Sequence, residues 1–148
     1  MNVKKISIVI PSYNEEKNLK KGVLDQVEDY LKEIKLDYEV LVVDDGSSDN
    51  SSKLVKKYTS KNKNFRLIQN SHGGKAMAVM TGMERAAGEV VLFTDMDQAT
   101  PINQLDKFIP KYDSGYDIVI GSRQGRKGAP LVRKLSAWGF SLLRGLIL

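Results

Sequence analysis

The sequence predicts an α/β fold, in which helices pack on a mostly parallel, twisted sheet. Two observations lead to this prediction. Short apolar runs alternate along the chain with segments whose apolar residues recur at helical spacing, which is the pattern of consecutive right-handed βαβ units. Most of these runs are also too uniformly apolar for a sheet with one face in water, as expected for strands that are buried on both faces.

The predicted strands are short runs rich in β-branched residues. They cover residues 5–10, 38–43, 65–69, 89–94 and 116–121. Polar clusters follow the first four strands, with the sequences PSYNEE, DDGSSD, NSHGGK and DMDQATP. Because ligands bind beyond the carboxyl ends of the strands in such a sheet, we expect these clusters to converge on one edge.

The predicted helices lie between the strands. Apolar residues recur at helical spacing from Leu19 to Ile34, from Leu54 to Tyr58 and from Ala76 to Ala87. Thr100 before Pro101 is typical of an N-cap and a first-turn proline, and predicts a further helix. No repeat, linker or low-complexity segment interrupts the pattern, so we expect the whole chain to be one domain.

The composition limits the available chemistry. There are no cysteines, which excludes disulfides, thiolate nucleophiles and cysteine zinc sites. His72 is the only histidine, so a multi-histidine metal site is excluded as well. The N-terminus lacks a signal-peptide pattern, and no run approaches the roughly 18 to 20 apolar residues of a membrane span. We therefore expect a cytoplasmic protein whose chemistry depends on carboxylates, lysine, arginine and backbone.

Asp95 and Asp97 follow the apolar run at residues 90–93 and are candidate metal ligands. In an extended segment residues i and i+2 point to the same side, so the two carboxylates would lie together and require a positive partner. Hard oxygen ligands suit Mg²⁺ or Mn²⁺, which fills its remaining positions with water and substrate phosphates. The alternative is a turn with two solvated aspartates.

The clusters after the first two strands contain residues suited to a nucleotide. Asp44 and Asp45 end a predicted strand, where a carboxylate can accept hydrogen bonds from a ribose or a base edge. The alternative is a turn in which Asp49 or Ser51 caps the next helix. In PSYNE, which begins at Pro11, the residues that could meet a flat base and its polar edge are Tyr13, Asn14 and Glu15. Glutamates here also favour a helix N-terminus, which is the simpler explanation.

The segment HGGK at residues 72–75 contains glycines that let the backbone approach a ligand, and Lys75 could meet a diphosphate. It matches neither the Walker loop nor the dinucleotide-binding fingerprint. The alternative is a simple glycine turn.

The basic surplus of the chain lies in its last segment. Residues 121–148 contain six Lys or Arg and no acid, whereas residues 1–120 have 17 basic and 18 acidic residues. Within residues 131–148 a helical wheel separates an apolar side, with Trp138, from a side with arginines. Such a helix is expected to bind an anionic membrane surface, and the alternative is a helix packed on the sheet. No nucleic-acid partner is expected, because no nucleic-acid motif accompanies the basic residues.

Taken together, the segments VIPSYNEEKNL, VLVVDDGSSDNS, GGKAMAVMTGMERAAGEVVLFTDMD and GSR resemble the family 2 glycosyltransferases of the GT-A fold. Within that family the chain is most similar to the dolichyl- or polyprenyl-phosphate sugar synthases, particularly the glucosyl branch. The resemblance covers nearly the whole chain and implies a three-layer α/β/α sandwich. It also implies a UDP-glucose or GDP-mannose donor, a dolichyl- or polyprenyl-phosphate acceptor, Mg²⁺ or Mn²⁺, and inversion at the sugar.

The resemblance further implies roles for individual residues. The residues that would hold the nucleoside are Pro11, Tyr13, Glu15 and Asp44. Lys75 would lie near the donor, and Asp95 and Asp97 would bind the metal on its diphosphate, so that Asp97 is a catalytic residue. Arg123 and Arg133 would act in catalysis by meeting the phosphate of the lipid acceptor at the cytoplasmic face of the membrane.

The chain departs from the family pattern in three places. Ala76 stands where a second glycine usually follows the lysine, and Ala99 stands where mannosyl relatives often carry a glutamine. Adjacent Gln98 is not taken as its substitute. The sequence also stops at Leu148 in mid-pattern, so we expect a catalytic domain that is truncated at its C-terminus, with an incomplete acceptor site.

A phosphate acceptor agrees with the composition of the chain. A phosphate monoester is largely anionic at pH 7, because its second pKa is about 6, and it needs no strong general base. Two alternatives stay open. A soluble transferase acting on a sugar hydroxyl would require a positioned carboxylate base, and a noncatalytic nucleotide-sugar or membrane-surface binding module would bind without turnover.

Overall fold

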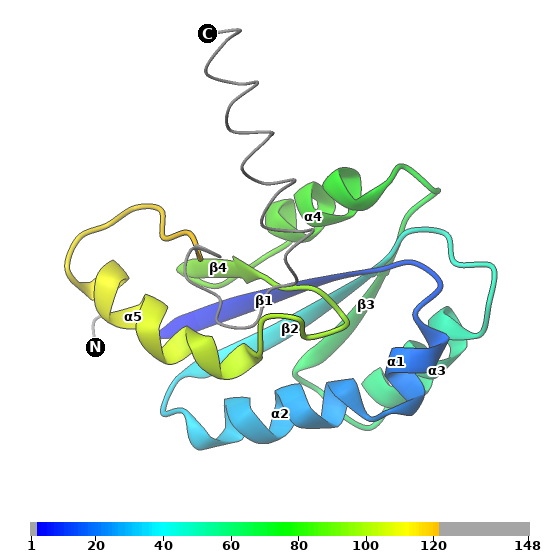
Figure 1. The fold of residues 1–148 in the computed structure, drawn as a ribbon, viewed down its shortest axis with the longest axis horizontal. Coiled ribbons are helices and arrows are strands. Elements are labelled where there is room, and N and C mark those ends of the chain that lie inside the picture. The colour runs from blue at the N-terminus through cyan, green and yellow to red at the C-terminus, as the bar shows by residue number, and fades with distance from the viewer. Residues whose placement is uncertain (1–2, 122–148) are drawn as a thin grey trace, which may run out of the picture. The chain divides into compact units, whose positions relative to one another are not determined.

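A computed structural model describes residues 3–121, whose arrangement is shown in Figure 1. The sheet consists of the strands β1 (Lys5–Ser12), β2 (Asp37–Asp44), β3 (Phe65–Gln69) and β4 (Val90–Phe93). Their order is β3-β2-β1-β4, and every neighbouring pair is parallel. The predicted parallel sheet is therefore confirmed, with β1 and β2 at its centre.

Helices cover both faces of this sheet. They are α1 (Glu16–Lys20), α2 (Val23–Glu33), α3 (Ser51–Thr59), α4 (Lys75–Glu84) and α5 (Leu105–Asp113), with a short 3₁₀ helix, η1 (Ile102–Gln104), directly before α5. In Figure 1, α4 lies on one side of the sheet and the other helices lie on the opposite side. This confirms the predicted α/β class with its three layers.

The alternation of side chains along the strands produces a core on each face. On one face Ile8 and Ile10 of β1 pack with buried residues of α2, α3 and α5. On the other face Val9 packs with Ala78 of α4. The strands are apolar at successive positions because both faces are covered, as expected for a parallel sheet.

Two glycines allow the α4 segment to approach the sheet closely. A Cβ on Gly82 would lie 2.3 Å from Cγ1 of Val9 and 3.1 Å from Cγ2 of Val43. A Cβ on Gly88, in the turn before β4, would lie 2.6 Å from the backbone nitrogen of Ser7. Since protein interiors are densely packed, these glycines fix how deeply α4 and the following turn lie against β1.

Two predicted helices differ from the observed ones. The helix predicted from Leu19 to Ile34 is divided into α1 and α2 at Gly22, whose φ of 77° suits glycine and interrupts helical geometry. The prediction that Thr100 is an N-cap with Pro101 in the first turn is wrong. Pro101 itself precedes η1 with an extended backbone (φ −61°, ψ 145°), so the helical segment begins one residue later.

Residues 116–121 are predicted to form a strand, but they are not part of one. A strand requires a hydrogen-bonded neighbour, and the strands in the described residues pair only with one another. Local apolar composition does not supply such a neighbour. The chain divides after Asp117 into two compact units, and only residues 118–121 of the second unit are described.

Candidate functional site

A pocket of about 310 Å³ lies at the carboxyl ends of the strands. Loops after all four strands contribute to it, together with the start of α4. Its lining residues are Pro11, Ser12, Tyr13, Glu15, Asp45, His72, Gly74, Lys75, Ala78, Asp95, Met96 and Asp97. The four polar clusters converge as predicted, because parallel strands bring their carboxyl ends to the same edge.

Asp95 and Asp97 lie in a turn and not on an extended strand end. β4 ends at Phe93, and the N–H of Gln98 donates a hydrogen bond to the carbonyl oxygen of Asp95 at 3.1 Å. Between the two aspartates, Met96 is 2% exposed and belongs to the core. With Met96 anchored in this way, both carboxylates line the pocket. The two carboxylates share a side as predicted. The cause, however, is the turn around the buried Met96 and not the alternation of side chains along a strand.

Lys75 is a positive partner for one member of the acidic pair, Asp95. Its Nζ lies 2.5 Å from Oδ1 of Asp95, and the two side chains are 60% and 37% exposed. Oδ1 of Asp97 accepts a hydrogen bond from the N–H of Ala99 at 2.9 Å. Within residues 3–121, no group of three or more acidic, histidine or cysteine side chains could enclose a metal ion. Asp95 and Asp97 would supply two hard carboxylate ligands. Such a set fits Mg²⁺ or Mn²⁺, because these ions take water and phosphate oxygens as their remaining ligands.

Asp45 organises the loop between β3 and α4. Its carboxylate accepts hydrogen bonds from the N–H groups of Gly73 at 3.0 Å and Gly74 at 2.7 Å. Its Oδ2 also lies 3.0 Å from Nδ1 of His72. Gly74 has a φ of 87°, which favours glycine at the start of α4. Both oxygens of Asp45 thus have protein partners, and its contact with a nucleotide stays a prediction.

Tyr13 and His72 stack within the pocket lining. Their ring centroids are 4.4 Å apart and their planes differ by 29°. Tyr13 remains 47% exposed, so its ring is accessible to a flat base. From the sequence, His72 reads as a simple loop residue, and the only signal for a role is its position in the polar cluster after β3.

Asn14 joins the loop after β1 to the loop after β2. Its Oδ1 accepts hydrogen bonds from the N–H groups of Ser48 at 2.9 Å and Asp49 at 3.3 Å. Its own N–H donates to Oγ of Ser47 at 3.0 Å. Asn14 adopts a φ of 54°, a conformation that asparagine tolerates better than most residues. It does not line the pocket, so its predicted contact with the nucleotide remains a prediction.

Glu15 lines the pocket and is held by the start of α3. Its N–H donates to Oγ of Ser51 at 2.7 Å, and its Oε2 accepts from Asn18 at 2.6 Å. Asp49 accepts hydrogen bonds from the N–H groups of Ser51 and Glu16. Burial raises the pKa of Asp49, but these hydrogen bonds outweigh it, so the pKa lies below its ordinary value. The N-cap of α3 is Asn50, so neither Asp49 nor Ser51 is the cap considered from the sequence, although Asp49 accepts the N–H of the first helical residue.

Three buried oxygens at this edge of the sheet have no hydrogen-bond partner within the described residues: Oγ of Ser12, Oδ1 of Asp44 and Oε1 of Gln98. Ser12 and Asp44 are neighbours in the register of β1 and β2, and they are 2% and 3% exposed. Buried polar groups are usually paired. These acceptors are therefore positions where a polar ligand or water would complete the hydrogen bonding, and Ser12 was not among the predicted site residues.

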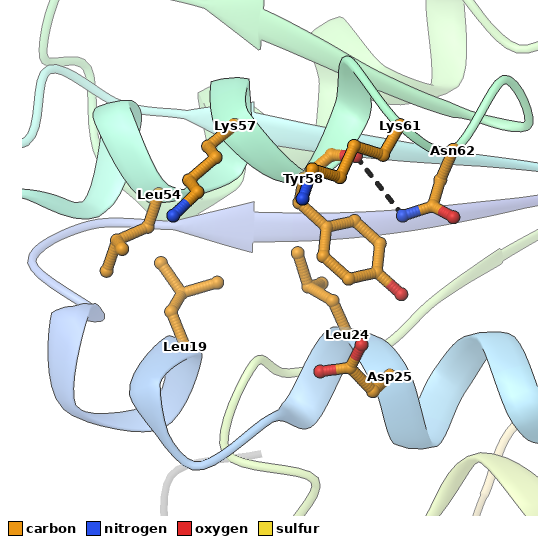
Figure 2. Close-up of a pocket in the computed structure, with 8 residues that line it drawn as sticks. All are labelled: Leu19, Leu24, Asp25, Leu54, Lys57, Tyr58, Lys61 and Asn62. Carbon is orange, nitrogen blue, oxygen red and sulfur yellow. Dashed lines mark hydrogen bonds between the residues drawn. The ribbon is translucent and has the colours of Figure 1, made fainter.

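A second pocket of about 310 Å³ lies among the helices α1, α2 and α3. Figure 2 shows its lining, which consists of Leu19, Leu24, Asp25, Leu54, Lys57, Tyr58, Lys61 and Asn62. Burial and a hydrogen bond from the hydroxyl of Tyr58 to Glu28 raise the pKa of Tyr58. None of the four strand-end clusters lines this pocket, so the candidate site is the pocket with the acidic pair.

Some predictions lie outside the described residues. Arg123, Arg133 and the basic segment at residues 131–148 belong to residues 122–148. Within residues 3–121, no helix combines the length and the apolar character that crossing a membrane requires.

Known proteins show similarity to most of this chain. The family model described as glycosyl transferase family 2 matches residues 7–144. An undecaprenyl-phosphate 4-deoxy-4-formamido-L-arabinose transferase from Proteus mirabilis is 34% identical over 127 residues, which are 84% of this chain and 39% of that protein. The chain therefore spans about two fifths of the length of this curated relative.

Solved structures share the fold. Mannosyltransferase PcManGT from Pyrobaculum calidifontis, in complex with GDP-Man and Mn²⁺, matches with a TM-score of 0.55 and 27% identity over 66% of this chain and 28% of that chain. TarS from S. aureus, in complex with UDP, matches with a TM-score of 0.56 and 28% identity over 85% of this chain and 38% of that chain.

Proposed function

The chain belongs to glycosyltransferase family 2, and from this premise we propose that it transfers a hexose from a nucleotide sugar to dolichyl or polyprenyl phosphate. The observation that carries the proposal is the convergence of Asp95, Asp97 and Lys75 with Tyr13 in one pocket. An acidic pair, an ammonium and an accessible aromatic ring are groups suited to binding a metal-bound nucleoside diphosphate.

The donor would bind across the loops that follow the strands. Pro11 and Tyr13 line the pocket and would offer surfaces for the nucleoside base, and the carboxylates of Glu15 and Asp45 line it as well. Asp44 is buried and does not line the pocket, but it directly precedes Asp45. Oδ1 of Asp44, which has no hydrogen-bond partner among residues 3–121, supports a polar contact with the nucleoside. Relatives solved with UDP and with GDP-Man support UDP-glucose or GDP-mannose as donor, without distinguishing the two.

The diphosphate would lie between α4 and the acidic turn. Lys75 is the first residue of α4, and a helix N-terminus is favourable for anions because of the helix dipole. Asp95 and Asp97 would hold Mg²⁺ or Mn²⁺ beside it. When bound, the metal neutralises the charge that develops on the departing nucleoside diphosphate.

A phosphate acceptor would complete the reaction. Its oxygen is already anionic near pH 7, so attack on the anomeric carbon needs no strong base, and the sugar configuration would invert. The undecaprenyl-phosphate sugar transferase among the relatives supports a polyprenyl acceptor. Arg123 and Arg133 would meet the acceptor phosphate, and the basic residues 131–148 would place the protein at the cytoplasmic surface of the membrane.

A transfer assay tests this proposal. The chain would be incubated with polyprenyl phosphate, Mn²⁺ and radiolabelled UDP-glucose or GDP-mannose, and the label in the organic phase would be counted. We expect labelled lipid with one of the donors, and background counts for Asp97→Ala. Label transferred to a sugar hydroxyl without lipid would contradict the acceptor, and binding of the donor with no nucleotide release would indicate a noncatalytic binding module.

A further inference from the structure

The ion pair between Lys75 and Asp95 places an ammonium group on a candidate metal ligand. Nζ of Lys75 lies 2.5 Å from Oδ1 of Asp95. A divalent cation at this oxygen would bring two positive charges close to the ammonium, and like charges at short range repel each other. The ammonium and the metal are therefore alternative partners for the same carboxylate.

This ion pair can be broken at little cost. The side chains of Lys75 and Asp95 are 60% and 37% exposed, and exposed ion pairs contribute little stability. An exposed pair of this kind therefore weakens the binding of a competing metal at Asp95 by about fivefold at most. The lysine stem is flexible, so the ammonium can move without a change in the backbone.

The pocket offers the displaced ammonium a second partner once a donor is bound. Lys75 and Gly74 line the pocket at the N-terminus of α4, and the first turn of this helix contains no acid. A diphosphate beside the acidic turn would lie within the same pocket and would carry several negative charges. An ammonium that leaves Asp95 would therefore find an anionic partner without leaving the site.

We propose that Lys75 exchanges partners, pairing with Asp95 in the metal-free site and with the donor diphosphate when a metal occupies Asp95. This inference rests on the proposed function, and it makes the binding of metal and nucleotide interdependent. Without nucleotide, Lys75 competes with the metal. With nucleotide, the same ammonium contributes to binding of the diphosphate, and such coupling between two ligands is reciprocal.

Manganese binding measures this exchange directly. The electron paramagnetic resonance signal of free Mn²⁺ would be titrated with wild-type protein and with Lys75→Gln, first without and then with UDP or GDP. Lys53→Gln is the matched control, because it removes the same charge from an exposed position on α3, across the sheet from α4. We expect Lys75→Gln to bind Mn²⁺ about two- to fivefold more tightly than wild type without nucleotide. It should bind the nucleotide more weakly in the presence of Mn²⁺.

The outcomes separate this inference from the proposed function. If wild type binds both Mn²⁺ and nucleotide but Lys75→Gln has unchanged Mn²⁺ affinity, the exchange is wrong and the proposed function stands. If Lys75→Gln gains Mn²⁺ affinity to the same extent with nucleotide present and keeps its nucleotide affinity, Lys75 stays on Asp95 and the exchange is again wrong. If neither protein binds Mn²⁺, both the exchange and the proposed metal site are wrong.

Discussion

The phenol ring of Tyr13 stacks on the imidazole of His72, with ring centroids 4.4 Å apart. Nδ1 of His72 in turn lies 3.0 Å from the buried carboxylate of Asp45 at the end of β2. The aromatic surface proposed for the nucleoside base is therefore supported by residues from two other strand-end loops. The position of the Tyr13 ring therefore depends on the packing of the loops that contain His72 and Asp45.

Replacing His72 with alanine should weaken nucleotide binding and leave the fold intact. Aromatic pairs contribute about 0.5–1.5 kcal/mol beyond their buried area, so the Kd for the bound nucleotide should rise by about two- to tenfold. His72→Phe keeps a stacking surface and should retain most of the affinity. Calorimetric titration with nucleotide and Mn²⁺ measures both variants. Unchanged affinity for His72→Ala would show that the stack does not position Tyr13.

Replacing Asp45 with alanine should destabilise the protein as well as the site. The N–H groups of Gly73 and Gly74 would lose their acceptor, at a cost of about 1–3 kcal/mol in the free energy of unfolding. Asp97→Ala removes a carboxylate from an exposed residue of the same pocket and should change that energy by less than about 1 kcal/mol. Urea unfolding compares the two variants. Equal losses would mean that Asp45 does not organise the loop.

Replacing Gly82 with alanine should destabilise the contact between α4 and the sheet. The added Cβ would lie 2.3 Å from Cγ1 of Val9, so the helix or the strand must shift. Overpacking of this kind lowers the free energy of unfolding by about 1–3 kcal/mol. Met80→Ala, on the exposed side of α4, is the control and should change stability by no more than about 0.5 kcal/mol. A stable Gly82→Ala variant would disprove the close approach.

Glu39 makes the stability of the sheet dependent on pH. This buried carboxylate accepts hydrogen bonds from Oγ of Ser7 at 2.7 Å and the N–H of Ala87 at 2.6 Å, and it pairs with Arg66. Burial acts to raise the pKa of Glu39, but the hydrogen bonds from Ser7 and Ala87 outweigh it. The pKa therefore lies below its ordinary value of 4.5.

Because the folded-state pKa is lowered, the stability that the Glu39 carboxylate contributes is present above the ordinary value and is lost as the pH falls through the lowered one. Glu39→Gln should thus reduce the free energy of unfolding by about 1–3 kcal/mol at pH 7 and by clearly less near pH 3. Urea unfolding of both proteins at the two pH values measures the difference. A difference that does not depend on pH would contradict the role of the charged form.

The sequence predicts the part of the structure that depends on local pattern. Strand runs such as residues 38–43 are apolar throughout because helices cover both faces of the sheet. The parallel direction of the strands brings the four polar clusters to one edge. The failures also have a local cause. The positive φ of Gly22 divides a continuous helical pattern, and residues 116–121 have strand composition without a paired neighbour in the described structure.

The contacts within the site could not be predicted, because they form between loops that meet only in the folded protein. The pairing of Lys75 with Asp95 joins residues 20 positions apart, and Asn14 binds the loop that follows β2 through hydrogen bonds across more than 30 positions. No residue spacing indicates these partners. Residue type did identify the acidic pair and the lysine, since the chemistry of each side chain is fixed before folding.

The central claim is that Asp95 and Asp97 hold a divalent metal against a nucleoside diphosphate. Calorimetric titration with UDP and with GDP, each with and without Mn²⁺, tests it most directly. We predict that one of the two nucleotides binds at least about tenfold more tightly with the ion, a difference of about 1.4 kcal/mol, and that Asp97→Ala abolishes this enhancement. Equal affinities with and without Mn²⁺ in the wild-type protein would contradict the claim.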